Sequence, residues 1–341
     1  MDYHFFSDPE FAGPGNAHLA QFWDREPRQL RRNAPVQPAP PCKFTIFKAT
    51  ADINHEIAKL WNSCYSGSDW RFSCNPTEVE RWRQQGFILA MRNDEGLLIG
   101  TFAVRRLPKG IVCGRRIPNV FVLDGLVIHP DYRNKGLASH FLSVTDREIY
   151  NTPTLATSVL LWFREHESLI TACTQAPVAI LEYAYVHLED LPYKTEPVLK
   201  APTEMVKNLV DAIARDEQFT LVSTDTDDID VRWFLTKSAI VGIANTHRVT
   251  TDGLSIWEVV FAANLVKPYF KNLTSAIEAA GGELGYSKGI LFASNGRTRG
   301  NFKAAFSPWK IGASGFLTAH VYNWMPPEFL TGDVLFPHSC I

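Results

Sequence analysis

The stretch Val122-Leu-Asp-Gly-Leu-Val-Ile-His-Pro-Asp-Tyr-Arg-Asn-Lys-Gly-Leu-Ala138 decides the fold of this chain. Its apolar first half is interrupted by Asp124 and Gly125 and is bounded by turn residues, which predicts a buried strand. A glycine inside such a run indicates a β-bulge or a close approach of a ligand to the backbone. Phe141 and Val144 follow Leu137 at helical spacing, so we expect a helix to begin there.

A polar turn, Arg133-Asn-Lys-Gly136, joins this strand to this helix. Such a turn presents free N–H groups and the positive end of a helix dipole, which together favour a pyrophosphate group. The sequence pattern Arg133-x-x-Gly136-x-Ala138 resembles the acyl-CoA-binding signature of the GNAT superfamily. An ordinary strand–turn–helix junction with a basic surface is the alternative. The strand before the turn and the helix after it are the context that the signature requires, so acyl-CoA binding is favoured.

Composition excludes several classes of protein. With 341 residues, 45% hydrophobic and 21% charged, the chain can form two domains, or one large one, with ample core. A net charge of −2 gives no case for a nucleic-acid partner. No apolar run is long enough to span a membrane, and the N-terminus does not resemble a secretory signal. The six cysteines are scattered along the sequence. We therefore expect no metal site, reduced thiols and a cytoplasmic location. The sequence shows no obvious heptad or exposed apolar stretch, which favours a monomer.

The first half of the chain is predicted to form one GNAT-like lobe, preceded by an N-terminal arm. Residues 1–41 are rich in proline and form the expected N-terminal arm. The elements expected after the arm are a strand at 44–47, a helix at 53–65, a loop at 66–72, a helix at 76–85, strands at 87–91 and 97–105 joined by a turn, a strand at 118–128, a helix at 137–150 and a strand at 159–163.

The second half echoes this order. The expected elements are a helix at 204–216, a hairpin at 239–248 and 255–264, a helix at 271–280, and strands at 289–293 and 317–324. The segment at 168–178 is ambiguous, and the acidic run at 224–230 is interpreted as a solvated loop. The sequence thus predicts an α/β fold of tandem GNAT-like lobes, 42–200 and 201–341, with a mixed twisted sheet flanked by helices.

Several separate stretches, in order, resemble the N-myristoyltransferase family, which acylates the N-terminal glycine of proteins. The resemblance covers roughly residues 18–341 and is weakest between 150 and 225. The segments that carry it are Gln21-Phe-Trp-Asp-Arg-Glu-Pro27, Leu60-Trp-Asn-Ser-Cys-Tyr65, Trp70-Arg-Phe72, Thr77-Glu-Val-Glu-Arg-Trp82, the opening stretch, Arg232-Trp-Phe-Leu235, the segment 283–295, and the segment 310–324 with its Val-Tyr-Asn-Trp ending.

The resemblance implies roles for individual residues. Myristoyl-CoA would be the acyl donor and N-terminal glycine peptides the partners. The backbone N–H groups of Gly125 and Leu126 would stabilise the developing oxyanion, and the terminal carboxylate of Ile341 would be the general base. The implied cofactor-binding residues are Gln21, Phe22, Trp23, Leu126, Val127, Arg133, Asn134, Lys135, Gly136, Leu137 and Ala138. The implied substrate-binding residues are Tyr65, Asp69, Trp70, Phe72, Asn295 and Tyr322.

The chain also departs from the family pattern. The tail continues through 336–341, so either it bulges to place Ile341 at the site or the base is His338, Glu189 or Asp190. Gly136 replaces a second basic residue in the turn, and the loop at 66–69 keeps only Asp69 of its usual acids. Two alternatives therefore stay open: a GNAT enzyme that transfers a shorter acyl group, such as acetyl, and an acyl-CoA-binding module without activity.

Overall fold

The computed structural model describes residues 28–29, 43–67, 70–107, 110–112, 115–117, 120–151, 159–164, 175–188, 197–202, 204–206, 208–209, 219–220, 231–237, 239–265, 270–284, 289–294, 314–322, 324–325 and 334–335. The helices with defined bounds are η3 (Ala51–Ile53), α1 (Asn54–Cys64), α2 (Pro76–Gln84), η4 (Pro130–Tyr132), α3 (Leu137–Asn151) and α6 (Phe270–Glu283).

The strands lie before, between and after these helices. They are β1 (Arg28–Gln29), β2 (Thr45–Lys48), β3 (Trp70–Phe72), β4 (Gly86–Arg92), β5 (Leu98–Leu107), β6 (Gly110–Val112), β7 (Arg115–Ile117), β8 (Val120–Ile128), β9 (Val159–Arg164), β10 (Gln175–His187), β11 (Leu199–Lys200), β12 (Phe219–Thr220), β13 (Val231–Leu235), β14 (Ala239–Thr250), β15 (Ser255–Asn264), β16 (Ile290–Ser294), β17 (Ser314–Tyr322), β18 (Trp324–Met325) and β19 (Val334–Leu335).

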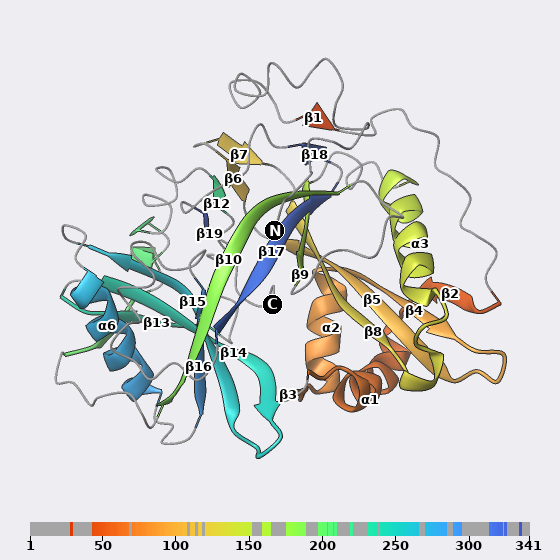
Figure 1. Cartoon of the computed structure of the whole chain (residues 1–341), viewed down its shortest axis with the longest axis horizontal. Helices are drawn as coiled ribbons and strands as arrows, with labels where there is room; N and C mark the ends of the chain where they lie inside the picture. Colours follow the sequence, from red (N-terminus) through yellow and green to blue (C-terminus); the bar gives the residue numbers. More distant parts are fainter. Residues whose placement is uncertain are drawn as a thin grey trace.

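One mixed sheet connects the two lobes. Within the described residues it holds 13 strands in the order β11-β13-β14-β15-β16-β10-β17-β9-β8-β5-β4-β2, with β3 paired to β14. The long strands β10 and β17 cross the middle of the molecule, between α6 on one side and α1–α3 on the other (Figure 1). Strand β17 pairs with β10 on one side and with β9 on the other, and so joins the strands of the two lobes into one sheet.

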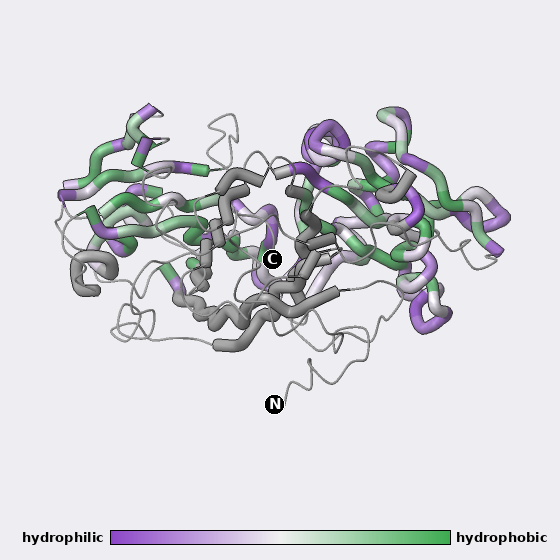
Figure 2. The backbone as a smooth tube through the Cα atoms, turned by 90° about the horizontal axis from the view of Figure 1, so that it is seen from above, coloured by the Kyte–Doolittle hydropathy of each residue, from purple (hydrophilic) through white to green (hydrophobic). Residues whose placement is uncertain are grey.

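The first lobe has two apolar layers, one on each face of its strands. Helix α3 packs Phe141 and Leu142 against one face, together with Phe102 and Leu123. Helices α1 and α2 cover the other face (Figure 1), where Trp61 belongs to a separate buried cluster. Figure 2 shows apolar segments along the strands and hydrophilic ones at the outer turns. A strand covered on both faces is apolar at consecutive positions, so the polar residues are left to the turns.

Local signals set the ends of the elements that carry the site. Asn75 caps α2 by accepting bonds from the N–H groups of Thr77 and Glu78, and the Glu78 carboxylate accepts from the Asn75 N–H in return. This capping box satisfies N–H groups that the first turn of a helix leaves free. Gly96 closes the β4–β5 hairpin at φ +83°, a left-handed conformation that glycine adopts without steric cost.

The second lobe repeats the strand–helix–strand order of the first. In both lobes a long strand leads through a helix to a parallel partner: β8, α3 and β9, then β15, α6 and β16. The long strand has an irregular register with its other neighbour in each case, between Thr101 and Ala103 and between Gly242 and Ile243. The expected tandem GNAT-like architecture is therefore confirmed.

Three features differ from the expectation or extend it. Part of the loop expected at 66–72 is strand β3, which pairs with β14 from residues 248 to 250. A short hairpin, β6–β7, stands where no element was expected. The end of the ambiguous segment 168–178, from residue 175 on, belongs to β10, a 13-residue strand. Most of the N-terminal arm, much of 204–216 and all of 224–230 lie outside the described residues.

Candidate functional site

The expected bulge lies in the middle of β8. Ala103 of β5 pairs with Asp124, whereas Thr101 pairs with Val127, so Gly125 and Leu126 together oppose one residue of β5. Gly125 has φ +59°. A Cβ atom built there would lie 3.2 Å from the Trp82 ring. The sequence therefore requires glycine here for two reasons, the left-handed backbone and the crowded space.

A buried chain of hydrogen bonds holds this bulge. The Trp61 indole N–H donates to the Thr101 hydroxyl over 2.8 Å, and that hydroxyl donates to the Gly125 carbonyl over 3.1 Å. Trp61 is 1% exposed and Thr101 is fully buried. Because all three polar groups are removed from water, each depends on its partner, and the bulge geometry is fixed by α1 and β5.

Strand β8 separates from β9 just before the bulge. The parallel pairing covers only residues 120–122 of β8 and 159–161 of β9. Beyond Val122 the β9-facing edge of β8 has no ladder partner among the described residues. Backbone N–H and C=O groups that lack a ladder partner are ready to pair with an extended ligand.

The turn after β8 offers free donors. Asn134 and Gly136 have φ of +60° and +74°, and α3 begins at Leu137. Among the described residues, no backbone carbonyl accepts a bond from the N–H groups of residues 134–139; the first such bond runs from the His140 N–H to the Gly136 carbonyl, over 3.2 Å. Clustered N–H groups at a helix N-terminus form an anion site.

Two basic side chains hold this turn in place. The Arg133 guanidinium donates to the carbonyls of Ile128 and Cys64, over 3.0 and 2.9 Å, and so joins the ends of β8 and α1. Lys135 donates to the Asp131 carbonyl over 2.8 Å. Both side chains thus make structural bonds in the turn that the sequence predicted to bind the cofactor.

The predicted substrate side chains from the α1–α2 segment gather in one aromatic group. The Tyr65 ring lies 5.6 Å from the Trp70 ring and 5.4 Å from the Phe72 ring. Phe72 is 6% exposed and is a core residue. Arg248 of β14 stacks 4.3 Å from the centre of the Trp70 ring and bonds the Tyr65 side chain. Burial raises the pKa of Tyr65, and the charge of Asp124 raises it further.

Asp124 faces this aromatic group from the bulge. Its carboxylate forms an ion pair with Arg105, whose guanidinium lies 3.9 Å from the centre of the Trp82 ring. The sequence analysis did not single out Asp124 or Arg105. The available signal was a carboxylate inside an apolar strand, because a buried charge needs a partner.

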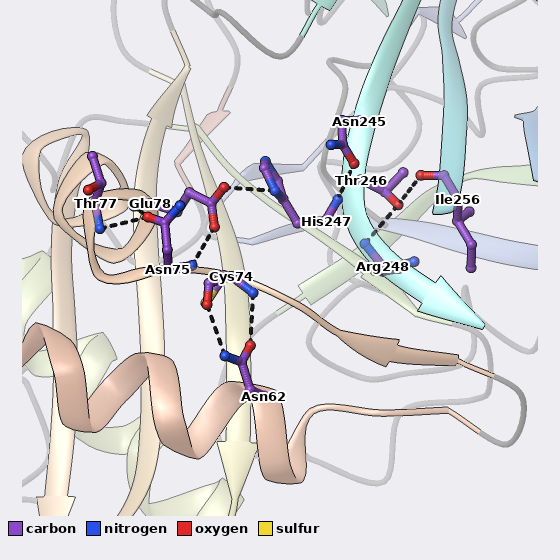
Figure 3. Close-up of polar contacts among 10 residues, drawn as sticks. All are labelled: Asn62, Cys74, Asn75, Thr77, Glu78, Asn245, Thr246, His247, Arg248 and Ile256. Atoms are coloured by element: carbon purple, nitrogen blue, oxygen red, sulfur yellow. Dashed lines mark hydrogen bonds and ion pairs between the residues drawn. The ribbon is translucent and has the colours of Figure 1, made fainter. Parts of the chain in front are cut away.

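A second ion pair joins the lobes beside this group (Figure 3). The Glu78 carboxylate of α2 lies 2.8 Å from Nδ1 of His247. His247 has φ +56° and lies in the irregular part of β14 between Asn245 and Arg248. The Ser73 N–H donates to the His247 carbonyl over 2.7 Å. The segment after β3 is thus fixed to both lobes, since the Asn62 side chain also bonds the backbone of Cys74.

Several predicted site residues fall outside the described residues. These are Gln21, Phe22, Trp23, Asp69, Asn295 and Ile341, together with the alternative bases Glu189, Asp190 and His338. The backbone of Tyr322 lies at the end of β17, opposite Gln175 of β10 and Leu160 of β9. The described residues contain no cluster of ligands that could hold a metal ion, and none of their helices is long and apolar enough to cross a membrane.

The chain is similar to known acyltransferases. Residues 54–144 match the acetyltransferase (GNAT) family. Saccharomyces cerevisiae N-myristoyltransferase with bound myristoyl-CoA superposes with a TM-score of 0.66 at 15% identity, over 88% of this chain and 87% of that one. A GCN5-related N-acetyltransferase from Kribbella flavida superposes with a TM-score of 0.51 at 11% identity, over 82% and 70%.

No curated protein sequence matches this chain. At these identities the superpositions establish the fold, and the family match covers the segment from α1 into α3 that contains the bulge and the turn. The chain therefore has the fold of the N-myristoyltransferases, and its residues 54–144 match the acetyltransferase (GNAT) family.

Proposed function

We propose that this protein is a glycylpeptide N-tetradecanoyltransferase, which transfers myristate from myristoyl-CoA to the N-terminal glycine amine of protein substrates. The observation that carries the proposal is the arrangement along β8. The strand separates from β9 at Val122, bulges at Gly125 and ends in a turn with free N–H groups. One extended acyl-CoA fits these three features in sequence.

The donor would bind with its pyrophosphate on the N–H groups of residues 134–139 and its pantetheine along the open edge of β8. Ile128 lies three positions after Gly125 along the strand, which corresponds to roughly 10 Å. The thioester would then lie at the bulge, where the Leu126 N–H would meet the carbonyl oxygen. The Gly125 N–H, which donates to the Asp124 carboxylate in the structure, would have to exchange that partner for the oxyanion to act as the second donor. Loss of one such donor typically slows acyl transfer by about 10²–10³.

The second lobe and the arm would complete the site. In this proposal residues 1–41 fold over the acyl-CoA through Gln21, Phe22 and Trp23, the lobe at 42–200 binds the donor, and the lobe at 201–341 contributes the peptide cleft. Tyr65, Asp69, Trp70, Asn295 and Tyr322 would contact the peptide, with Phe72 supporting them from the core. The resemblance to the family assigns the base to Ile341, and the enzyme would act as a cytoplasmic monomer.

Mass spectrometry tests this function directly. The protein is incubated with an octapeptide that starts with glycine and with either myristoyl-CoA or acetyl-CoA. We expect the peptide to gain one tetradecanoyl group, and a matched peptide that starts with alanine to gain none. No product with either donor would contradict the proposal.

A shorter acyl donor is the second candidate, favoured by Gly136 in the turn and by the match to the acetyltransferase family. Donors of increasing chain length separate the two. A pocket for myristate should gain ~0.8 kcal/mol for each buried methylene until it is full, about a fourfold change in Kd. An affinity that does not change beyond acetyl would favour the second candidate.

A further inference from the structure

Asp124 is the only acidic residue of β8 and directly precedes Gly125 of the bulge. Ala103 of β5 faces Asp124 and packs with the α1–α2 layer, and Asp124 precedes Gly125, whose built Cβ atom also points to the rings of that layer. Leu126 instead packs with the α3 layer. The bulge therefore turns Asp124 and Gly125 to the same side of the sheet, toward the aromatic group.

The Asp124 carboxylate is held at both oxygens. Oδ2 pairs with Arg105, and Oδ1 accepts a bond from the Gly125 N–H over 2.6 Å. The Arg105 side chain is 6% exposed and the Asp124 side chain 11%. An ionised carboxylate offers about four acceptor positions, so the two bonds from described residues leave room for an ammonium group. The residual exposure of Asp124 indicates that this room is reachable.

Charges around Asp124 favour the release of a proton by a bound ammonium group. Arg105 faces it from β5, and Tyr65 and Arg248, from the end of α1 and from β14, lie in the same electrostatic group. Among the described residues this group holds two guanidinium charges and one carboxylate. Nearby positive charge disfavours the protonated form of an amine, whereas the carboxylate accepts the proton that the amine releases.

We propose that Asp124 is a catalytic residue of this site, which binds the ammonium group of the acceptor and takes its proton, and that Arg105 is its positioning residue. The inference rests on the proposed acyl transfer and replaces the base that the family resemblance assigns. Free carboxylates of a side chain and of a chain terminus differ by only about half a pKa unit, so intrinsic basicity does not favour Ile341.

The step balances as follows. The acceptor ammonium gives one proton to an Asp124 oxygen and becomes a free amine. The amine attacks the thioester carbonyl carbon, a C–N bond forms, and the C–S bond breaks. The second nitrogen proton passes to the sulfur, which leaves as CoA thiol. Asp124 then returns its proton to solvent.

The first test is Asp124→Asn, measured with the acyl-CoA that the wild type uses. General base catalysis typically contributes about 10²–10⁴, so we expect kcat at pH 6.5 to fall by about 100-fold or more while the Kd for acyl-CoA stays within about twofold. An α-amino group has a pKa near about 8. The ratio of the wild-type kcat to the variant kcat should therefore fall about tenfold per pH unit up to pH 8, because the acceptor amine then loses its proton without a base.

A double variant separates catalysis from folding. Asp124→Asn alone removes the negative charge that pairs with the buried Arg105, which can destabilise the lobe. Asp124→Asn with Arg105→Gln removes both charges. We expect this protein to fold, to bind acyl-CoA, and to keep the low rate with the same rescue by pH. Asp94→Asn, at the exposed tip of the β4–β5 hairpin, is the matched control and should retain the wild-type rate.

The outcomes separate the two proposals. Product from the wild type, with a low and pH-rescued rate in both Asp124 variants, supports the inference. Product from the wild type with a near-normal rate in either the single or the double variant overturns it, since Asp124 would then only neutralise Arg105. No product from the wild type with any acyl donor overturns the proposed function, and the inference with it.

Discussion

The Glu78 carboxylate lies 2.8 Å from Nδ1 of His247 and ties helix α2 of the first lobe to strand β14 of the second. Both side chains are largely buried, at 12% and 20% exposure. His247 reaches this position from a left-handed backbone conformation, which is uncommon for a residue with a side chain. A strained residue persists where its surroundings hold it, here by a charge from the other lobe.

Glu78→Gln should lower the free energy of unfolding by about 1–3 kcal/mol, because it removes the charge from a largely buried pair. Glutamine can still serve in the capping box with Asn75, so the helix cap is retained. Urea unfolding of Glu78→Gln, His247→Asn and the double variant measures the interaction free energy between the two side chains. Asparagine tolerates the left-handed conformation. Strictly additive effects of the two changes would show that the pair contributes nothing.

Thr101→Val should destabilise the protein by about 2–4 kcal/mol and slow acyl transfer. Valine keeps the shape but leaves the Trp61 N–H and the Gly125 carbonyl without partners in a buried place, and each unsatisfied group costs about 1–3 kcal/mol. Thr101→Ser, the control, keeps the hydroxyl and should lose only about 1 kcal/mol for the missing methyl group. Equal losses for valine and serine would refute the importance of the hydroxyl.

Gly125→Ala and Gly96→Ala form a matched pair. Both glycines have a left-handed backbone, with φ of +59° and +83°, so both changes cost about 1–2 kcal/mol for conformation. A Cβ atom at Gly96 meets nothing within 4 Å, whereas one at Gly125 lies 3.2 Å from Trp82 and 3.4 Å from Trp61. Thermal unfolding should show a larger loss for Gly125→Ala. Only that variant should lose transfer activity, since only that bulge carries the proposed oxyanion donors.

The sequence predicted the parts of the site that depend on local pattern. The glycine in an apolar run indicated the bulge, and the apolar spacing after Leu137 indicated α3. Each of these signals lies within a few residues of the feature that it specifies. The same holds for the β4–β5 and β14–β15 hairpins, whose turns contain glycine.

Features that depend on distant partners were not predicted. Strand β3 has only three residues, and its partner β14 lies about 180 positions along the chain, so no periodicity indicates it. Asp124 implied a partner, but several arginines were available. Only the register that places Ala103 opposite Asp124 brings Arg105, two residues further on the same face of β5, to its carboxylate.

His140 makes the stability of the first lobe depend on pH. Burial in α3 lowers the pKa of His140 below its ordinary value of 6.5, and the charge of Arg147 lowers it further. A lowered folded pKa means that the folded state favours neutral imidazole. This stabilisation is complete above pH 6.5, and it is lost as the pH falls from there through the folded pKa, because the unfolded chain binds the proton more readily.

His140→Gln should remove this dependence. The slope for one proton reaches at most about 1.4 kcal/mol per pH unit, so the unfolding free energy of the wild type should fall faster than that of the variant between pH 6.5 and pH 5. Urea titrations at half-unit steps measure both slopes. The comparison of slopes is unaffected by packing that the substitution loses at every pH. Parallel curves for the two proteins would show that another group dominates the acid response.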